Sequence, residues 1–333
     1  GDGRAVLRSS IREYLAGHAL TALGVPSSQA LALVDSRTPV QRETLERGAM
    51  LLRVADSHVR LGHFEWINRF APALLQPFTQ QMMAWYFPDC LNDEQPVLAF
   101  AREVVLRTAR LIADWQRVGF AHGVMNTDNL SITGSTLDFG PYGFMERFEP
   151  GWINNHSDHQ GRYVYQNQPA IGHWNLWVWL GQLLRLGLSR ESLQAVLAEY
   201  EPEFLRHYQT GICARMGLPD HPDSFAVAME WLALLADEQL DYTNSFRALC
   251  GDWEALIDDC VDRERFRRFA GRYRALREDA SPALLARMIQ HNPVYVLRNR
   301  LAQNAIERAE QGDYSALDRL FVLLSSPFEV QDR

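Results

Sequence analysis

The stretch that decides the fold of this 333-residue chain reads His122-Gly-Val-Met-Asn-Thr-Asp-Asn-Leu-Ser-Ile132, followed directly by Thr133-Gly-Ser-Thr-Leu-Asp-Phe-Gly140. Leu130–Ile132 and Thr136–Leu137 have the pattern of two short strands joined by a tight turn. Such a hairpin would bring the side chains of Asn129 and Asp138 close together. An amide oxygen and a carboxylate are ligands that Mg²⁺ accepts, because this hard cation prefers oxygen donors. The sequence therefore predicts a divalent-metal site at the hairpin.

The same spacing resembles the catalytic loop of protein kinases, where His-Arg-Asp, four residues and Asn precede a hairpin and Asp-Phe-Gly. Asn129 falls at the kinase Asn, and Asp138 falls at the Asp of Asp-Phe-Gly. The position of the kinase base is occupied by Val124, which cannot accept a proton. The pattern predicts the metal-binding half of a kinase without its usual base. The alternative interpretation of Asp138 alone is an ordinary turn residue.

Composition bounds the class of protein. The chain is 47% hydrophobic and 22% charged with a net charge of −8, which suits a substantial core of two lobes and argues against a broad nucleic-acid surface. The sequence contains no run of 18 apolar residues, so it predicts no membrane span, and no signal peptide is visible. The four cysteines are scattered without Cys-x-x-Cys spacing, as reduced thiols would be. We therefore expect a cytoplasmic protein.

Lysine does not occur in the sequence, and all 33 basic residues are Arg. Neither the Lys of a P-loop nor the strand Lys of a kinase can come from this chain. Phosphate contacts are expected from Arg, from backbone N–H groups or from a segment before Gly1. The sequence begins without Met and runs directly into a helical pattern, which predicts a piece of a longer protein.

Apolar spacing predicts a first helix over 6–23, ended by Gly24–Pro26. Strands are expected at 30–34 and 49–54. A helix is the alternative for the second segment, because Arg53 and Arg60 lie seven residues apart. Further helices are expected at 67–85, at 94–118 and from 170 onward, with breaks at Gly217–Pro219, Pro282 and Pro293.

An irregular stretch at about 141–169 separates the hairpin from the later helices, and such a stretch is usually functional. Trp174, Trp177 and Trp179 lie in a helical pattern and are expected to pack in the core. The predicted fold class is α+β and mostly helical. A kinase-like lobe with additional C-terminal helices fits this pattern.

Longer motifs resemble the selenoprotein O family. They occupy residues 1–13, 122–129, 137–145, 155–158, 161–169, 174–176 and 292–299. The resemblance runs nearly end to end. It implies a pseudokinase fold and a bacterial protein adenylyltransferase. Such an enzyme binds ATP in a flipped orientation and transfers AMP to Ser, Thr or Tyr hydroxyls of other proteins.

The resemblance also implies roles for individual residues. Asn129 and Asp138 would bind the divalent metal, Mg²⁺ or alternatively Mn²⁺, and Asp138 would belong to the ATP site as well. Arg53 and Arg60 would hold the displaced phosphates. The further nucleotide contacts would come from Asp2 and Gly3. For the two arginines, the alternative is a solvated helix face that makes surface ion pairs.

Asp128 is the candidate proton acceptor that replaces the base lost at Val124. The alternative is a structural carboxylate that braces the loop or supports a metal ligand. Glu13 would correspond to the helix Glu that orients a Lys in kinases. Without that Lys, Glu13 is expected to be an exposed helix carboxylate. His122 would brace the loop by analogy with kinases.

Three parts are predicted along the chain: 1–92 as the remainder of the N-terminal lobe, 93–250 as the catalytic lobe, and 251–333 as a C-terminal helical extension. The family's N-terminal nucleotide-binding segment and C-terminal tail are missing from the sequence, so we expect a fragment. A kinase-like phosphotransferase and a non-catalytic ATP-binding pseudoenzyme are the alternative functions. Protein substrates are the expected partners, with no nucleic acid and no membrane, and the oligomeric state stays open.

Overall fold

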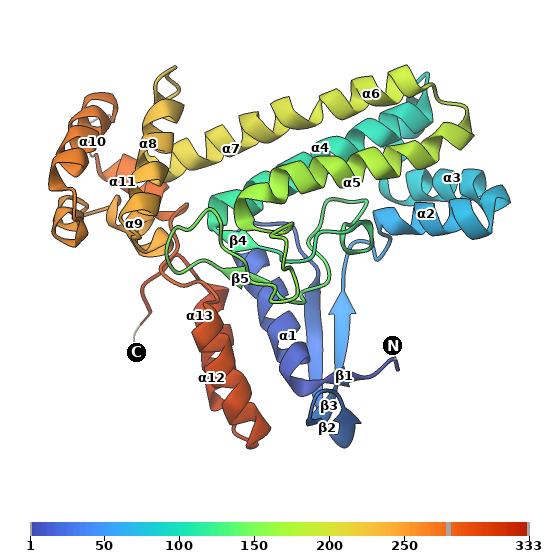
Figure 1. Cartoon of the computed structure of the whole chain (residues 1–333), viewed down its shortest axis with the longest axis horizontal. Coiled ribbons are helices and arrows are strands. Elements are labelled where there is room, and N and C mark those ends of the chain that lie inside the picture. The colour runs from blue at the N-terminus through green and yellow to red at the C-terminus, as the bar shows by residue number, and fades with distance from the viewer. Residues whose placement is uncertain (1, 278–280, 332–333) are drawn as a thin grey trace.

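The structure is a computed structural model that describes residues 2–277 and 281–331. A small sheet packs against one helix, α1 (Leu7–Ala22), below a larger helical body (Figure 1). The sheet is antiparallel in the order β1-β3-β2, with β1 (Ala5–Val6), β2 (Gln29–Gln41) and β3 (Leu45–Val54). The helix predicted at 6–23 and the two predicted strands are confirmed. The helical alternative for the second segment is wrong, because Arg53 lies in β3 opposite Ala30.

The helical body is built around α4, the 23-residue helix that runs through its centre (Figure 1). The helices packed with it or beside it are α2 (Leu61–Phe70), α3 (Leu75–Tyr86), α4 (Pro96–Val118), α5 (Gln168–Leu183), α6 (Arg190–Ala198) and α7 (Tyr200–Met216). At one end lie α8 (Ser224–Asp237), α9 (Tyr242–Ala248), α10 (Arg263–Leu276) and α11 (Pro282–Ile289). Two short strands, β4 (Phe120–Ala121) and β5 (Gly143–Phe144), pair antiparallel beneath α4 and α5.

The last two helices, α12 (Asn299–Glu310) and α13 (Ser315–Ser325), return to the beginning of the chain. The ring of Phe321 stacks on His18 with centroids 3.8 Å apart and on Tyr14 at 5.1 Å. Arg47 of β3 donates hydrogen bonds to the carbonyls of Ala309 and Glu310 at the end of α12. The C-terminal helices therefore pack with α1 and the sheet.

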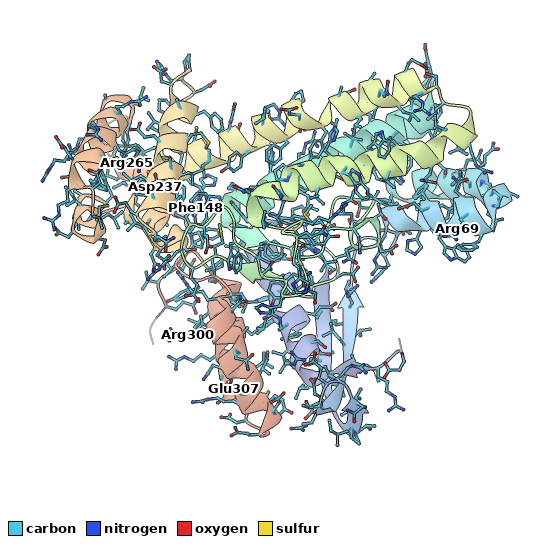
Figure 2. All side chains as sticks on the ribbon, in the orientation of Figure 1. Arg69, Phe148, Asp237, Arg265, Arg300 and Glu307 are labelled. Carbon is cyan, nitrogen blue, oxygen red and sulfur yellow. The ribbon has the colours of Figure 1, made fainter. Side chains whose placement is uncertain are left out.

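Two clusters of buried apolar side chains form the core. The first cluster contains side chains from α1, α2, α3, α4, α5, α6, α12 and α13. The second contains side chains from α7, α8, α9, α10, α11 and the segment after β5. Figure 2 shows Asp237 and Arg265 facing each other between α8 and α10, and their ion pair measures 2.6 Å. The second cluster contains both Phe246 and Trp253 and so extends across residue 250. The three predicted parts stay a prediction.

Several local predictions are wrong in instructive ways. The helix predicted at 67–85 is two helices, because Ala71 leaves the helical region (φ −145°) before Pro72. Pro282 begins α11 instead of breaking a helix, as proline fits the first helical turn. Of the three tryptophans expected in the core, only Trp179 is buried, while Trp174 is 43% exposed and Trp177 is 57% exposed.

The fold class predicted as α+β and mostly helical is confirmed. The helix at 94–118 is also confirmed. The stretch at 141–169 is irregular apart from the two residues of β5, a 3-10 turn at Tyr165–Asn167 and the start of α5 at Gln168. Across residues 2–277 and 281–331, no helix has both the length and the apolar character that crossing a bilayer requires.

Candidate active site

The two strands predicted at Leu130–Ile132 and Thr136–Leu137 are not formed, because the hairpin has a single bridge of its own and is held mainly by neighbouring segments. Leu130 and Thr136 make one antiparallel bridge, and Gly134 supplies the turn with φ of +77°. The carbonyl of Leu130 accepts from the N–H of Leu61 at 2.9 Å, at the start of α2. The carbonyl of Thr136 accepts from the N–H of Ser28 at 3.0 Å. The turn is thus fixed between α2 and the segment before β2.

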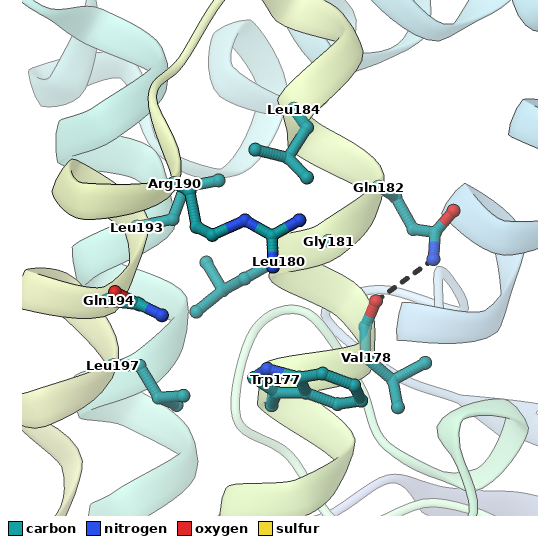
Figure 3. A pocket seen from close by; sticks show the side chains of 10 residues that line it. All are labelled: Trp177, Val178, Leu180, Gly181, Gln182, Leu184, Arg190, Leu193, Gln194 and Leu197. Carbon is teal, nitrogen blue, oxygen red and sulfur yellow. Dashed lines mark hydrogen bonds between the residues drawn. The ribbon is translucent and has the colours of Figure 1, made fainter.

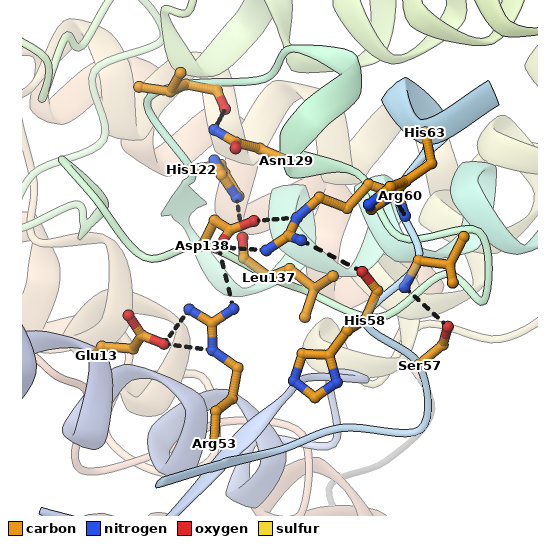
Figure 4. Close-up of polar contacts among 12 residues, drawn as sticks. Glu13, Arg53, Ser57, His58, Arg60, His63, His122, Asn129, Leu137 and Asp138 are labelled. Carbon is orange, nitrogen blue, oxygen red and sulfur yellow. Dashed lines mark hydrogen bonds and ion pairs between the residues drawn. The ribbon is translucent and has the colours of Figure 1, made fainter. Parts of the chain in front are cut away.

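Asp138 follows the hairpin in the left-handed region of the backbone, with φ of +62°. Residues other than glycine rarely adopt this conformation, and Asp tolerates it better than most. Such residues cluster at functional sites because the surrounding contacts must hold them there. Here the carbonyl of Leu137 accepts a 2.8 Å hydrogen bond from Nε2 of His122. The backbone therefore directs the Asp138 side chain toward two arginines (Figure 4).

Arg53 and Arg60 converge on Asp138 from separate elements, β3 and the start of α2 (Figure 4). Arg60 donates two hydrogen bonds, Nε to Oδ2 at 2.7 Å and Nη2 to Oδ1 at 2.9 Å. Arg53 donates a third, Nη1 to Oδ1 at 3.1 Å. Burial by itself raises the pKa of Asp138. The hydrogen bonds and charges of Arg60, and then of Arg53, lower the pKa by more than burial raises it, so the pKa lies below its usual value.

Glu13 of α1 extends this cluster on the other side of Arg53. Nε of Arg53 donates to Oε1 of Glu13 at 2.6 Å, and the carboxyl side chain is only 21% exposed. The expectation of an exposed helix carboxylate is therefore wrong, because Glu13 pairs with Arg53 of β3. Burial lowers the pKa of Arg53, while the charges of Glu13 and Asp138 raise it more, so the guanidinium stays charged.

Two carboxylates and two guanidinium groups thus alternate through the cluster Glu13, Arg53, Asp138 and Arg60. Each charge is neutralised by a neighbour. An open pocket of about 380 Å³ lies beside Arg53 and Glu13. Its other lining residues come from β1, the first turns of α1, β3 and the loop before α2: Ala5, Ser9, Ser10, Leu51 and His58. A polyanion entering this pocket would meet Arg53, which Glu13 and Asp138 already hold in place, and Arg60 lies on the other side of Asp138.

Asn129 lies above Asp138 in the close-up, on the loop that contains Val124 (Figure 4). Its Nδ2 donates to the carbonyl of Val124 at 2.9 Å, which fixes the amide. Among the described residues no donor is bonded to its Oδ1, so this oxygen is available as a ligand. The side chain of Val124 itself offers no proton acceptor.

Asp128 is exposed and lies against the first turn of α2. A methyl group on Gly62 would come within 2.1 Å of Oδ1 of Asp128, so a larger residue there would force the Asp128 carboxylate to move. A carboxylate beside a helix N-terminus is stabilised by the helix dipole. This contact suits the bracing role, and the exposure leaves the carboxylate accessible as a base. The role of Asp128 stays a prediction.

His122 is fully buried, and burial lowers its pKa, so the imidazole is neutral. Because a carbonyl can only accept, Nε2 carries the proton that reaches Leu137. Among the described residues, Nδ1 has no hydrogen-bond partner. This geometry fits the bracing role expected for His122.

Asp2 lies apart from the cluster. Its carboxylate accepts from Arg42 of the β2–β3 hairpin at 3.0 Å and from the N–H of Arg4 at 3.0 Å. Gly3 has φ of +70° in the same exposed segment. Their predicted nucleotide contacts stay untested.

One pair of site residues was not found from the sequence. Arg12 and Tyr142 clasp each other: Nη2 of Arg12 donates to the Tyr142 carbonyl at 2.6 Å, and the Tyr142 hydroxyl donates to the Arg12 carbonyl at 2.7 Å. The guanidinium also lies 4.4 Å from the ring centroid. This clasp ties α1 to the segment after Asp138. Its only signal in the sequence is position, next to Glu13 and just past Asp-Phe-Gly.

The donor set fits a hard divalent cation that arrives with phosphate. Asp138 and Asn129 supply oxygen ligands, and Mg²⁺ is usually bound by one or two such groups together with phosphate and water. Within residues 2–277 and 281–331, no cluster of three or more His, Cys, Asp or Glu could hold a metal without such help. Both oxygens of Asp138 are engaged by arginines. A cation would therefore compete with these contacts.

Comparison with known proteins shows the class of enzyme to which this chain belongs: it is a nucleotidyltransferase. It is 48% identical over 336 residues to the protein nucleotidyltransferase YdiU of Marinomonas sp. (strain MWYL1), covering 98% of this chain and 71% of the relative. The YdiU proteins of Pectobacterium atrosepticum and Myxococcus xanthus are 48% and 46% identical, with 99% and 98% of this chain matched to 70% of each relative.

The particular family follows from a sequence model described as protein adenylyltransferase SelO, which matches residues 1–325. The chain belongs to this family. The resemblance inferred from the motifs is thereby confirmed.

Proposed function

We propose that this chain transfers AMP from ATP to Ser, Thr or Tyr hydroxyls of proteins, with a divalent metal, on a kinase-like scaffold. The observation that carries the proposal is the convergence of Arg53 and Arg60 on Asp138 beside an open pocket. Two fixed guanidinium forks suit phosphate oxygens better than a single Lys would. We place the reaction in the bacterial cytoplasm, as the four free cysteines suit a reducing compartment.

In the proposed reaction the substrate hydroxyl oxygen bonds to the α-phosphorus, and the bond from that phosphorus to the bridging oxygen of the β-phosphate breaks. Pyrophosphate leaves, and the hydroxyl proton passes to a base, for which Asp128 is the candidate. Arg53 and Arg60 would offset the negative charge that grows on the leaving group. The missing base at Val124 argues against ordinary phosphoryl transfer.

Asn129 and Asp138 would hold the metal, Mg²⁺ or Mn²⁺, which would neutralise phosphate charge and orient the nucleotide. The phosphates would replace Asp138 as the partner of the arginines, and Asp138 would be released toward the cation. Glu13 would keep Arg53 in position during this exchange. Asp2 and Gly3 would contact the nucleotide from the segment before β1. We keep 1–92, 93–250 and 251–333 as the proposed parts of the scaffold.

The test compares ATP labelled at the α-phosphate with ATP labelled at the γ-phosphate, in parallel reactions with Mg²⁺ and a casein or myelin basic protein acceptor. Label from the α position alone, lost in Asp138→Ala and kept in Arg69→Ala, supports AMP transfer at this site. Arg69 is the matched control because it lies at the far end of α2, away from the cluster (Figure 2). Transfer of the γ label would establish a phosphotransferase instead, and ATP binding without transfer would indicate a pseudoenzyme.

A further inference from the structure

The two exposed tryptophans of α5 lie on a surface that the nucleotide site does not use. Trp174 and Trp177 are one turn apart, and the guanidinium of Arg162 lies 4.5 Å from the Trp174 ring centroid. Exposed tryptophans and arginines are enriched where proteins bind other proteins. Trp177 also forms one wall of a pocket between α5 and α6 (Figure 3).

This pocket, called here the α5–α6 pocket, has a volume of about 300 Å³. Trp177, Leu180, Leu193 and Leu197 make its apolar walls, and Leu180, Leu193 and Leu197 are buried. Gly181 leaves the pocket open, since a Cβ at this position would have no atom within 4 Å. The pocket is thus shaped for an apolar side chain that enters from solvent.

Charge at the rim narrows the choice of ligand. The guanidinium of Arg190 extends over the pocket (Figure 3), and within the described part of the chain it makes no ion pair. Gln182 is already engaged, because it donates to the Val178 carbonyl at 3.0 Å and accepts from Asn68 at 2.7 Å. An apolar cavity with one uncompensated cation at its rim fits a ligand that is apolar and acidic.

The position of the pocket links it to the active site. The first half of α5 holds the loop before Asp138: Asn175 donates to the Met125 carbonyl at 2.8 Å, and Gln168 donates to the Phe120 carbonyl at 3.0 Å. Gly181 lies six residues after Asn175, which is about 9 Å along a helix axis. Six residues also turn the helix by about 240°, so a peptide that joins the pocket to the loop must pass partly around α5 as well as along it.

We propose that the α5–α6 pocket docks the protein substrate, taking up a large apolar side chain against Trp177 while Arg190 pairs with a neighbouring acidic side chain. This inference rests on the proposed function, because it assigns a polypeptide as the acceptor. A docked segment would present a nearby hydroxyl to the catalytic loop, which contacts the first half of the same helix. Specificity would then depend on the docking segment as well as on residues around the hydroxyl.

The first experiment measures docking without catalysis. Fluorescein-labelled peptides carry one Phe and one Glu separated by zero to three residues, with matched peptides that have Ser for Phe or Gln for Glu. Fluorescence anisotropy should show binding of a Phe- and Glu-containing peptide to the wild-type chain. Gly181→Leu fills the pocket, and Arg190→Glu reverses its charge. Each should weaken binding at least about tenfold, a change of about 1.4 kcal/mol.

Arg185→Glu is the matched control, because Arg185 is an exposed arginine on the short turn after α5 and lines a different pocket. It should change binding by less than about twofold. Gly181→Leu should keep the thermal transition of the wild type, since a Cβ at this position has no atom within 4 Å and Leu favours helix. Equal binding of the peptides to all variants, or no binding of any peptide, would overturn the proposal. Decanoate is the comparison ligand because it is apolar and acidic without being a peptide, and binding of decanoate alone would also overturn the proposal.

The second experiment joins a docking segment to a peptide that contains Ser, Thr and Tyr, and follows the α label of ATP. The joined peptide should show a KM at least about tenfold lower than the acceptor alone, with kcat unchanged, and Gly181→Leu should abolish the difference. Failure of all label transfer would count against the proposed function, whereas the anisotropy result judges docking separately.

Discussion

Arg60 is the strongest partner of Asp138, and replacing it by Ala tests how the cluster is held together. The variant removes two of the three hydrogen bonds that Asp138 accepts and leaves one from Arg53. The Arg60 and Asp138 side chains are 23% and 24% exposed, so the pair is neither fully screened nor fully buried. Exposed pairs contribute about 0.2–1 kcal/mol, and hydrogen bonds to charged groups about 1.5–3 kcal/mol. We expect a loss of about 1–2 kcal/mol in the free energy of unfolding.

The lowered pKa of Asp138 also predicts how the loss of stability in Arg60→Ala changes with pH. The pKa of Asp138 is lowered in the folded protein, against about 3.9 in an unfolded chain. Its contribution is therefore present above the unfolded pKa and is lost as the pH falls through the lower folded pKa. Removing Arg60 raises the folded pKa of Asp138 toward the unfolded value. The difference in stability between wild type and Arg60→Ala should be full at about pH 7 and should shrink below about pH 4.

The assay is urea unfolding at a series of pH values for wild type, Arg60→Ala, Asp138→Asn and the double variant. The cycle isolates the pair, and its coupling energy should be about 1–2 kcal/mol at about pH 7. Arg69→Ala is the control for loss of a positive charge on the same helix. A coupling energy below about 0.3 kcal/mol, or a difference that stays constant down to about pH 2, would refute the reasoning.

Four further predictions follow from the site and the core. Val124→Asp should leave γ-phosphate transfer undetectable, measured with γ-labelled ATP, because the arginines rather than a missing carboxylate define the reaction. Gly62→Ala should lower the thermal transition and AMP transfer together, since the new methyl group would lie 2.1 Å from Oδ1 of Asp128, and overpacking costs about 1–3 kcal/mol. Arg215→Ala should cost about 3–5 kcal/mol in urea unfolding, because this buried guanidinium donates to Asn292 at 2.9 Å and lies 3.8 Å from the Phe246 ring. Removal of divalent metal with EDTA should abolish α-label transfer without changing the thermal transition of the nucleotide-free chain, and restored Mg²⁺ should restore transfer.

The sequence predicts the local elements well where one periodicity dominates. The helices over 6–23 and 94–118 were found because their apolar residues recur on one face. The single helix expected over 67–85 failed because its apolar spacing continues across Ala71 and Pro72, where the backbone turns. The tryptophans at 174 and 177 misled because periodicity identifies a helix face without saying what covers it.

The site shows the same division. Spacing alone placed Asn129 and Asp138 at the two ends of one hairpin, since a local turn fixes both. The partner of Glu13 could not be found in this way, because Arg53 reaches it from a strand 40 residues away. The Arg12–Tyr142 clasp joins residues 130 positions apart, and apart from its place beside the two motifs the sequence does not indicate that they meet. The sequence predicts site residues that one local turn brings together, whereas the charged partners of these residues depend on tertiary packing.

The stacking of Phe321 on Tyr14 and His18 also bears on how the chain is synthesised. The helix that carries Glu13 leaves the ribosome before α13, because the Phe321 side chain that stacks on it is translated about 300 residues later. Contacts so distant in sequence form slowly, and domains usually fold as they emerge. In the nascent chain, the face of α1 that contains Tyr14 and His18 therefore stays uncovered until α13 has left the exit tunnel. Chaperones that bind exposed apolar segments have their longest opportunity during that interval.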